Sequence, residues 1–423
     1  MDAPARAPED RPAERRAAAL AFAYFFALLA SYYLLRPIRE EMGIRGGVGA
    51  LHWTFTATFA ALLVAVPASS ALFARVPRTR AVPLVYRFFL AHLVLFAVAF
   101  ATRAWPVAVA RAFFVWLSVF NLLVVAVFWS FMADLFTAEQ GRRLFGRVAA
   151  GGSLGAIAGS AVAGLLVGAV GFAGVVALAA VLLEVAARCA VALSRAPPRG
   201  AAADTAPGRG DAGGPVGGTA WSGVAVVFRS SYLLALAAQL LLFTFGSTFL
   251  YFEQARIVAA AIPEPARRTV LFAAVDLAVN VGSFAVQAFA SGPLAVAFGL
   301  APALAAVPLL TGAGFVALAA APSIWAVGAV QGLRRIGHYA LERPARDVLF
   351  TVVPREQKYK SKPFIDTVVY RGGDALAAWT QSGLAALGLP GRELALAGVP
   401  LAVLALALGL WLARRERGLE VAS

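Results

Sequence analysis

Cysteine and histidine are scarce in this sequence, and their scarcity removes several kinds of site. Cys189 is the single cysteine among 423 residues, and there are three histidines. One cysteine cannot form an intrachain disulfide or a cysteine-rich metal site. The sequence also lacks the Gly-x-x-x-x-Gly-Lys-Ser/Thr motif of P-loop ATPases and the His-Glu-x-x-His motif of zinc proteases. We therefore predict no metal, no cofactor and no enzymatic activity.

Charged residues are also scarce, at 14%, whereas hydrophobic residues reach 61% and the mean hydropathy is +0.78. Soluble domains average about 25% charged and about 45–50% apolar residues, so this composition indicates a membrane protein. A helix needs about 20 apolar residues to cross a hydrocarbon core of about 30 Å. We predict an all-α, polytopic membrane protein with twelve spans, at residues 18–35, 52–74, 81–101, 107–133, 148–170, 172–193, 231–252, 270–291, 294–319, 323–350, 364–388 and 394–413.

The positive charge of the chain is arranged by loop. A formal net charge of +15 would suggest a nucleic-acid partner in a soluble protein. Here lysine and arginine gather in residues 75–80, 142–147 and 355–362, which lie on one side if the N-terminus is cytoplasmic. The positive-inside rule then places both termini in the cytoplasm, and residues 1–17 lack a signal-peptide cleavage site. We predict an integral protein of a bacterial inner membrane, with no nucleic-acid partner.

A segment rich in Pro, Gly and Ala divides the sequence into two halves of six predicted helices each. Such composition is typical of a flexible linker. The segments "DLFTAEQGRRLFGRVAAGGSLGA" and "DVLFTVVPREQKYKSKPFIDTVVYRGGDALAA" share an LFT, a basic loop and a Gly-Gly pair, which suggests an internal repeat. The predicted parts are an N-terminal tail (1–17), a six-helix bundle (18–193), a cytoplasmic linker (194–222), a second six-helix bundle (223–413) and a C-terminal tail (414–423).

This plan of two six-helix bundles resembles the major facilitator superfamily, which implies an alternating-access carrier with a central cavity. The segments "YYLLRPIREEMG", "FWSFMADLF", "RLFGRVAAGGSLGAIAGS" and "KYKSKPFIDTVVYRGGD" are similar to the nucleotide exchange carriers of the ATP/ADP translocase type and their bacterial relatives. In that family a cationic residue followed by a short acidic segment ends the first helix. Arg36, Arg39 and Glu40 occupy the comparable place, with arginine where the family usually has lysine.

The segment "SYYLLRPIREEMG" combines charge with a proline at the end of the first span. Pro37 has no amide hydrogen, so the helix is expected to kink or end there. Arg36 and Arg39 would then line the mouth of the cavity, paired with Glu40 or Glu41 until an anion competes. An ordinary interfacial cluster of charged side chains is the alternative.

Polar side chains inside two other predicted spans form stripes. A charge at the centre of a span costs about 2.5–3.5 kcal/mol on insertion scales, so these side chains must face protein or water. One helix face carries Asp276, Asn280, Ser283 and Gln287, and another carries Arg335, His338, Glu342 and Arg346. Interhelical hydrogen bonding and a cavity wall both remain open for the first stripe. His338 is either a packing residue or a group that couples transport to protons.

These observations define two sets of candidate site residues, and no catalytic residue. The substrate-binding candidates are Arg36, Arg39, Asn121, Asp276, Asn280, Arg334, Arg335 and His338. The candidates for gating or charge pairing are Glu40, Asp134, Glu342, Asp366, Arg371 and Asp374. Arg371 and Asp374, three residues apart, form either a static pair or a gate.

Glycines recur at four-residue steps in "GGSLGAIAGS", at positions 151, 155 and 159. Small residues at this spacing let helix backbones approach closely. The same stretch fits the Gly-x-Ser-x-Gly nucleophile elbow, but that motif needs a strand-to-helix turn and a separate histidine and acid. We therefore predict a close helix contact and not a nucleophilic Ser153.

The charged stripes and the family resemblance together predict a secondary active transporter. It would carry an anionic, phosphorylated or nucleotide-like solute by alternating access, with exchange or proton coupling. Two alternatives from other classes stay open, namely a membrane scaffold or assembly factor that transports nothing and an exporter of hydrophobic compounds. The expected partners are the solute and the lipid bilayer. A monomer is expected, although the sequence does not determine the oligomeric state.

Overall fold

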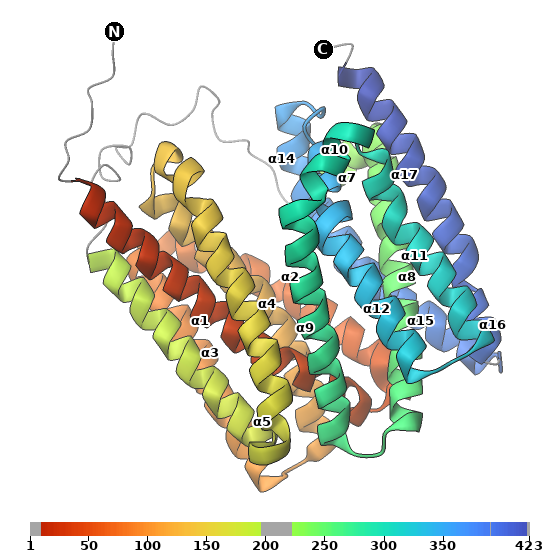
Figure 1. The fold of residues 1–423 in the computed structure, drawn as a ribbon, viewed down its shortest axis with the longest axis horizontal. Coiled ribbons are helices and arrows are strands. Elements are labelled where there is room, and N and C mark those ends of the chain that lie inside the picture. Colours follow the sequence, from red (N-terminus) through yellow and green to blue (C-terminus); the bar gives the residue numbers. More distant parts are fainter. Residues whose placement is uncertain (1–9, 196–221, 390, 421–423) are drawn as a thin grey trace. The chain divides into compact units, whose positions relative to one another are not determined.

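The computed structural model describes residues 10–195, 222–389 and 391–420 (Figure 1). The regular structure of these residues is helical throughout, as the apolar segments predict. In chain order the elements are α1 (Asp10–Arg45), η1 (Val48–Ala50), α2 (Leu51–Arg75), α3 (Arg78–Thr102), α4 (Pro106–Leu135), α5 (Ala138–Arg195), α7 (Ser222–Arg229), α8 (Ser231–Ala261), α9 (Pro265–Phe289), α10 (Ser291–Phe298), α11 (Ala301–Ala320), α12 (Ile324–Gly337), η2 (His338–Glu342), α13 (Arg343–Leu349), α14 (Arg355–Pro363), η3 (Phe364–Val369), α15 (Tyr370–Ala386), α16 (Gly391–Leu396) and α17 (Gly398–Glu420). Residues 1–9 and 421–423 of the predicted tails, and 196–221 of the predicted linker, lie outside the described residues.

Nine helices of the described ranges are long and apolar enough to cross a membrane. This number differs from the twelve predicted spans for two reasons. α5 contains the predicted spans 148–170 and 172–193 as two arms that meet at Gly171, whose φ of 66° and ψ of −176° are not helical. The segments 323–350 and 364–388 carry several charged side chains, which lower their hydropathy. The chain is an integral membrane protein with a polytopic, all-α fold.

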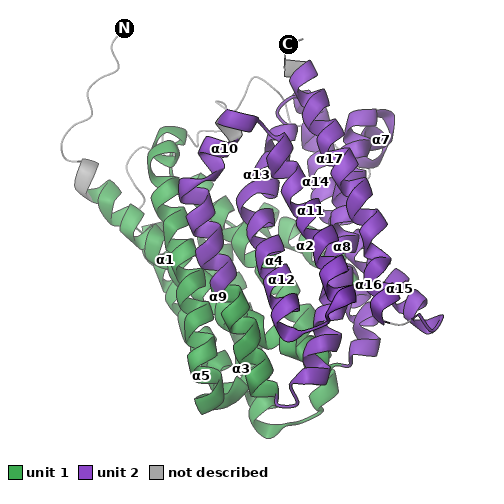
Figure 2. Cartoon of the chain, turned by 45° about the vertical axis from the view of Figure 1, so that its right-hand side comes forward, with its two compact units in different colours: residues 1–46, 60–212, 265–277 green, residues 47–59, 213–264, 278–423 purple. Residues whose placement is uncertain are grey.

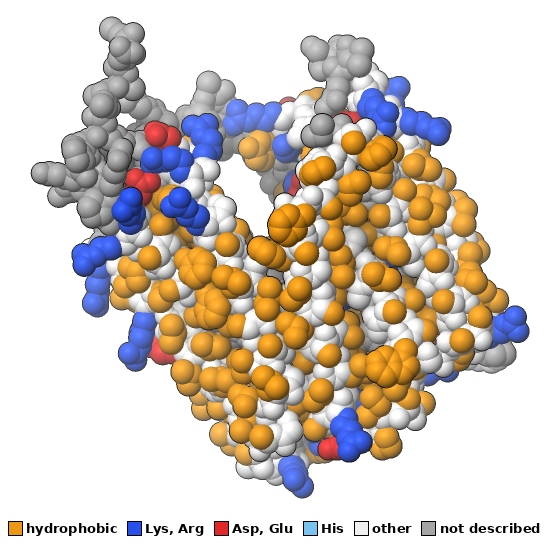
Figure 3. All heavy atoms as spheres, in the orientation of Figure 1, with side chains coloured by type: hydrophobic (Ala, Val, Ile, Leu, Met, Phe, Trp, Pro, Cys, Tyr) orange, Lys and Arg blue, Asp and Glu red, His pale blue; other side chains and the backbone are white. Residues whose placement is uncertain are grey.

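The surface of the helices is suited to lipid. Large apolar side chains such as Val64, Leu95 and Leu165 are exposed on α2, α3 and α5. Figure 3 shows hydrophobic side chains along the helices, with lysine and arginine gathered toward helix ends. Extensive apolar exposure is unusual for a soluble protein but favourable in hydrocarbon, where helices satisfy their own backbone hydrogen bonds.

Contacts divide the chain into two compact units (Figure 2). Unit 1 comprises the described residues of 1–46, 60–212 and 265–277, and unit 2 comprises those of 47–59, 213–264 and 278–423. The first turns of α9 therefore pack within unit 1, and the first turns of α2 pack within unit 2.

The core of unit 1 contains the predicted glycine contact, between α1 and α5. A Cβ added at Gly151 or Gly159 would lie 2.6 or 2.5 Å from a backbone oxygen of α1, and one added at Gly155 would overlap the carbonyl of Phe26. The close helix contact that the glycine spacing predicts is confirmed. Ser153 lies inside the same helix, where its hydroxyl bonds a backbone carbonyl one turn earlier. The strand-to-helix turn of a nucleophile elbow is therefore not present at this serine.

Unit 2 also contains a close helix contact at a glycine, and it has two π-helical turns. Gly373 of α15 lies against Thr244 of α8, where a Cβ would overlap the threonine hydroxyl. The π-helical turns are η2 (His338–Glu342), between α12 and α13, and η3 (Phe364–Val369), before α15. Turns of this type inside α-helices occur frequently at functional sites. η2 contains two of the candidate site residues.

Candidate functional site

α1 carries its charged residues inside a helix and not beyond its end. The helix continues through Pro37 to Arg45, so of the predicted kink or end at Pro37 the end is wrong. Pro37 removes one backbone donor, but Ile38 and Met42 beyond it are fully buried and stabilise the continued helix by packing. The charged groups of this segment consequently need partners within the protein.

Arg36 and Arg39 each have a partner in unit 1. Arg36 Nε lies 3.7 Å from Asp276 Oδ1 of α9, and the Asp276 side chain is almost fully buried. Arg39 donates to Ser118 Oγ of α4 at 3.1 Å and to Glu40 Oε1 at 3.2 Å. The structure thus joins the predicted residues Arg36 and Asp276 in one ion pair, and Arg39 and Glu40 in another.

A third and stronger ion pair joins α1 to α9 and was not predicted. Arg268 donates from Nε and Nη2 to the two oxygens of Glu41 at 2.6 and 2.7 Å, and Glu41 is fully buried. We call the three pairs together the α1–α9 charge cluster. Arg268 lies in the five residues 265–269, which α9 includes but which precede the predicted helix, because that prediction began at residue 270 whereas α9 begins at Pro265. Proline at the first position of a helix was the available signal.

Breaking the Glu41–Arg268 pair is expected to destabilise unit 1. Removal of one partner of a buried ion pair leaves an uncompensated charge, which costs about 3–5 kcal/mol. Glu41→Gln should therefore lower the melting temperature of the purified protein in detergent. The matched control is Glu184→Gln, because Glu184 forms ion pairs with Arg87 and Arg188 that are largely exposed and contribute little. Equal melting temperatures for both variants would contradict a structural role for the buried pair.

Unit 2 contains a second group of buried polar side chains, centred on η2. Glu342 is fully buried and accepts from Gln239 of α8 at 3.2 Å, and His338 Nδ1 lies 2.9 Å from its other oxygen. The His338 ring stacks on Phe243 of α8, with ring centroids 4.4 Å apart. Arg334 and Arg346 are buried on the same helical stretch. We call these residues, without Phe243, the η2 network.

The π-helical turn explains which residues of this stretch are buried. Arg334, His338, Glu342 and Arg346 are all buried, at a constant spacing of four residues. Four residues of an α-helix turn about 40° past a full turn, so this spacing would drift around the helix over twelve residues. η2 has i→i+5 hydrogen bonds and holds more residues per turn, which reduces the drift. Arg334 thus replaces Arg335 of the predicted stripe as the buried arginine.

Within the part of the chain that the structure describes, the two buried arginines of the η2 network have no carboxylate within ion-pair distance. Arg334 donates to Ser247 Oγ at 3.1 Å and to Gln331 Oε1 at 3.3 Å, and both partners are neutral. Arg346 Nη1 is buried and has no hydrogen-bond partner among the described residues. It interacts electrostatically with Glu342 and Asp366. Two cations therefore face one buried carboxylate, which already binds His338 and Gln239.

The remaining predicted residues lie outside these two groups. Asp374 accepts from Thr248 at 3.3 Å and lies 3.5 Å from Arg371, so the predicted pair exists. The other four are half-buried or exposed: Asn121, Asp134, Asn280 and Asp366. Of these, Asp366 interacts electrostatically with Arg346 of the η2 network. Arg335 is half-buried on α12. Gln239 was missed, although a polar side chain in the middle of an apolar span was a visible signal.

The arrangement in each unit is suited to holding charge inside helices. In the α1–α9 charge cluster each arginine is paired with a carboxylate, so the charges of each pair neutralise each other. In the η2 network two arginines share one carboxylate, so positive charge remains. A bidentate arginine binds carboxylate or phosphate well, because its planar fork donates two parallel hydrogen bonds. Among the described residues, no three His, Cys, Asp or Glu side chains gather in a way that would hold a metal ion.

The sequence matches no protein-family model and no curated protein sequence. Several solved structures with a similar fold are transporters. A bacterial homolog of the human lysosomal transporter Spinster, in an inward-facing and unoccupied conformation, aligns with a TM-score of 0.64 at 14% identity, over 95% of this chain and 97% of that one. A POT family transporter in complex with 5-aminolevulinic acid aligns with a TM-score of 0.64 at 12% identity, over 96% of each chain.

A third similar structure is the POT family transporter PepTSo, with a TM-score of 0.65 at 14% identity, over 96% of this chain and 99% of that one. These alignments cover nearly the whole of each protein. At such low identity they establish the fold alone. The chain therefore shares the fold of these three transporters.

Proposed function

We propose that this protein is a secondary active transporter that carries an anionic solute by alternating access. The similarity in fold to transporters over nearly the whole chain supports the mechanism. The observation that supports the charge of the solute is Arg334, a buried guanidinium whose hydrogen-bond partners are neutral. Arg334 shares the buried Glu342 carboxylate with Arg346, so the η2 network holds excess positive charge, which is costly to bury and which an anionic solute would balance.

The solute class follows from the chemistry of the η2 network. Arg334 binds a carboxylate or phosphate through two parallel hydrogen bonds and stays charged in a partly dry site. Arg346, with a buried Nη1 group that bonds nothing in the described chain, adds a second positive charge. The preferred substrates are therefore phosphorylated or carboxylated small molecules. The resemblance of "YYLLRPIREEMG" and three other segments to nucleotide exchange carriers favours nucleotides among them.

His338 and Glu342 provide a place where a proton could be exchanged during transport. The His338 Nδ1 to Glu342 Oε2 distance of 2.9 Å lets one proton lie between the two groups. Glu342 also lies close enough to Arg346 for electrostatic interaction, so an anion on the arginines and the carboxylate would compete for the same positive charge. This competition supports both exchange of one anion for another and coupling of anion uptake to protons.

Reconstituted liposomes test the proposal. The experiment measures uptake of radiolabelled ATP, glucose 6-phosphate and citrate, with glucose and tetraphenylphosphonium as neutral and cationic controls. Each solute is tested with an internal counter-solute, with a pH gradient and with neither. We expect saturable uptake of at least one anion. Stimulation of that uptake by the internal counter-solute assigns exchange, and stimulation by the pH gradient assigns proton coupling. Uptake of the neutral or cationic solute alone would overturn the anionic assignment, and no uptake of any solute would support the scaffold alternative.

A further inference from the structure

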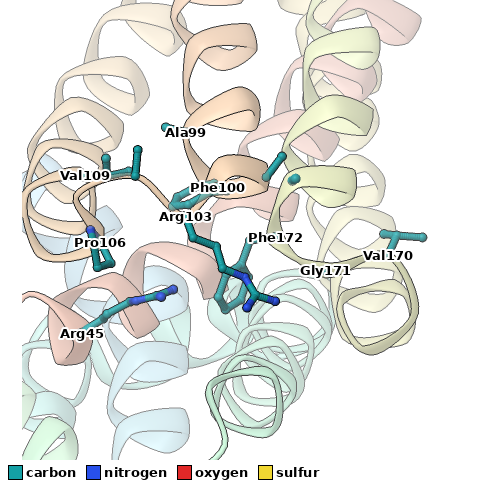
Figure 4. Close-up of a pocket in the computed structure, with 12 residues that line it drawn as sticks. Arg45, Ala99, Phe100, Arg103, Pro106, Val109, Val170, Gly171 and Phe172 are labelled. Atoms are coloured by element: carbon teal, nitrogen blue, oxygen red, sulfur yellow. The ribbon is translucent and has the colours of Figure 1, made fainter.

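Unit 1 contains a pocket at one end of its helices, and none of the residues that line it belongs to the α1–α9 charge cluster or to the η2 network (Figure 4). Its volume is about 430 Å³. Its walls come from the end of α1, the turn between α3 and α4, and the reversal of α5, including Arg45, Phe100, Arg103 and Phe172. Neither the sequence patterns nor the proposed transport function accounts for this pocket.

Three residues in or next to the pocket lining have a positive φ. Gly171 has a φ of 66°, which reverses α5 and which glycine adopts without strain. Arg103 and Trp105 have φ values of 55° and 40°, which are unusual for residues with a Cβ. The short turn that they form brings the Arg103 side chain to the pocket. Strained backbone of this type persists where the surrounding structure requires it.

The pocket is positively charged. Two of its twelve lining residues are arginines and none is acidic. Figure 4 shows Arg45 and Arg103 extending from α1 and from the α3–α4 turn toward the same space, beside Phe172. Neither arginine has a hydrogen-bond or ion-pair partner within the described ranges. Arg45 interacts electrostatically with Glu41, but that carboxylate already accepts two hydrogen bonds from Arg268.

The pocket lies at the ends of three candidate membrane spans. The candidate membrane spans Ala13–Arg45, Thr79–Thr102 and Pro106–Leu135 all end or begin at it, which places it where the helices leave the hydrocarbon core. Trp105 beside it is 80% exposed, and tryptophan is enriched at membrane interfaces. Arg111 donates to the Gly46 carbonyl at 2.8 Å and so fixes the backbone next to Arg45.

We propose that this pocket binds a phosphate group through Arg45 and Arg103, from the headgroup of a phospholipid or from a soluble phosphate. Two guanidinium groups provide charge-assisted hydrogen bonds to phosphate oxygens, which are the strongest that side chains form to anions. The apolar part of the lining, with Phe100, Val109 and Phe172, suits the glycerol and first methylenes of a lipid. The inference does not depend on the transport function.

Binding to delipidated, purified protein in a neutral detergent tests the proposal and distinguishes the two sources. The probes are dihexanoyl phosphatidylglycerol, inorganic phosphate and dihexanoylglycerol, which has the same short chains without the phosphate. The proteins are the wild type, the double variant Arg45→Gln/Arg103→Gln, and the control Arg75→Gln, whose exposed arginine ends α2. Melting temperatures without a probe establish that the variants fold, and Trp fluorescence reports binding.

Phosphatidylglycerol is expected to bind the wild type and Arg75→Gln alike, and its Kd is expected to rise at least about tenfold in the double variant. Dihexanoylglycerol should not bind measurably. Binding of phosphatidylglycerol alone assigns the site to lipid, and equally tight binding of inorganic phosphate assigns it to a soluble anion. The proposal is overturned if neither phosphate probe binds, if dihexanoylglycerol binds as tightly as the lipid, or if a folded double variant binds as the wild type does.

Discussion

Substitution of Arg334 by glutamine is expected to reduce uptake of the transported anion by about 100-fold, which corresponds to about 2.7 kcal/mol. Removing one member of a buried pair of charge and counter-charge typically costs about 2–5 kcal/mol of binding. Arg334→Lys should recover only part of the uptake, because an ammonium keeps the charge but not the two parallel hydrogen bonds. Initial rates of uptake into liposomes, measured across solute concentrations for the wild type and each variant, give the change in uptake.

The melting temperature of the same variant separates substrate binding from a structural role. Without solute, Arg334 is a buried charge with neutral partners, so Arg334→Gln is expected to melt at the wild-type temperature or higher. The stabilisation that solute gives to the wild type should be lost. The matched control is Arg343→Gln, since Arg343 is the exposed arginine of α13 on the same helical stretch. Undiminished solute stabilisation in Arg334→Gln would remove this arginine from the site.

The helical framework was predictable from the sequence because apolar runs of membrane length are a strong signal. The reversal between the predicted spans 148–170 and 172–193 lies at Gly171, the residue left between them, as glycine's tolerance of positive φ allows. The glycine steps of α5 were predictable for a similar reason, because a missing side chain marks a close contact whatever the partner helix is. The identity of that partner, α1, required the structure.

The candidate site was predictable only in part. A regular α-helical projection selects Arg335 with His338, whereas the structure buries Arg334, because η2 interrupts the α-helical register. No simple sequence pattern marks a π-helical turn. The role of Asp276 also depended on tertiary structure. Its position in an apolar span indicated a functional or paired carboxylate, but its partner Arg36 lies on a helix far away in the sequence.

Pro37 shows how packing overrides a local preference. Proline in a helix interior removes a hydrogen bond and clashes with the preceding turn, at a cost of about 3 kcal/mol. Burial of one large aliphatic side chain contributes about 1.5–3 kcal/mol, and both Ile38 and Met42 are fully buried after the proline. The continued helix also carries Glu41 to its partner Arg268. Sequence reasoning could not weigh these tertiary gains against the local cost.

The α1–α5 contact leads to the largest expected effect on folding. Gly155→Leu is expected to prevent accumulation of folded protein, because even a Cβ at this position overlaps the Phe26 carbonyl on α1. A leucine side chain would force the two helix backbones apart along the line of Gly151, Gly155 and Gly159. Gly155→Ala introduces the smallest possible clash and should lower stability by about 1–3 kcal/mol, the typical cost of overpacking a core. Monodisperse yield after size exclusion and thermal melting in detergent measure the two effects.

Gly168→Ala is the matched control, because it makes the same substitution in the same helix where no atom would lie within 4 Å of the new Cβ. Alanine favours a helix over glycine by about 0.5–1 kcal/mol, so this variant should melt at the wild-type temperature or slightly higher. Opposite shifts in the two alanine variants can only come from their surroundings, since the change in helix propensity is the same. If Gly155→Ala were as stable as Gly168→Ala, the α1 and α5 backbones would have to lie further apart than the contact at Phe26 implies.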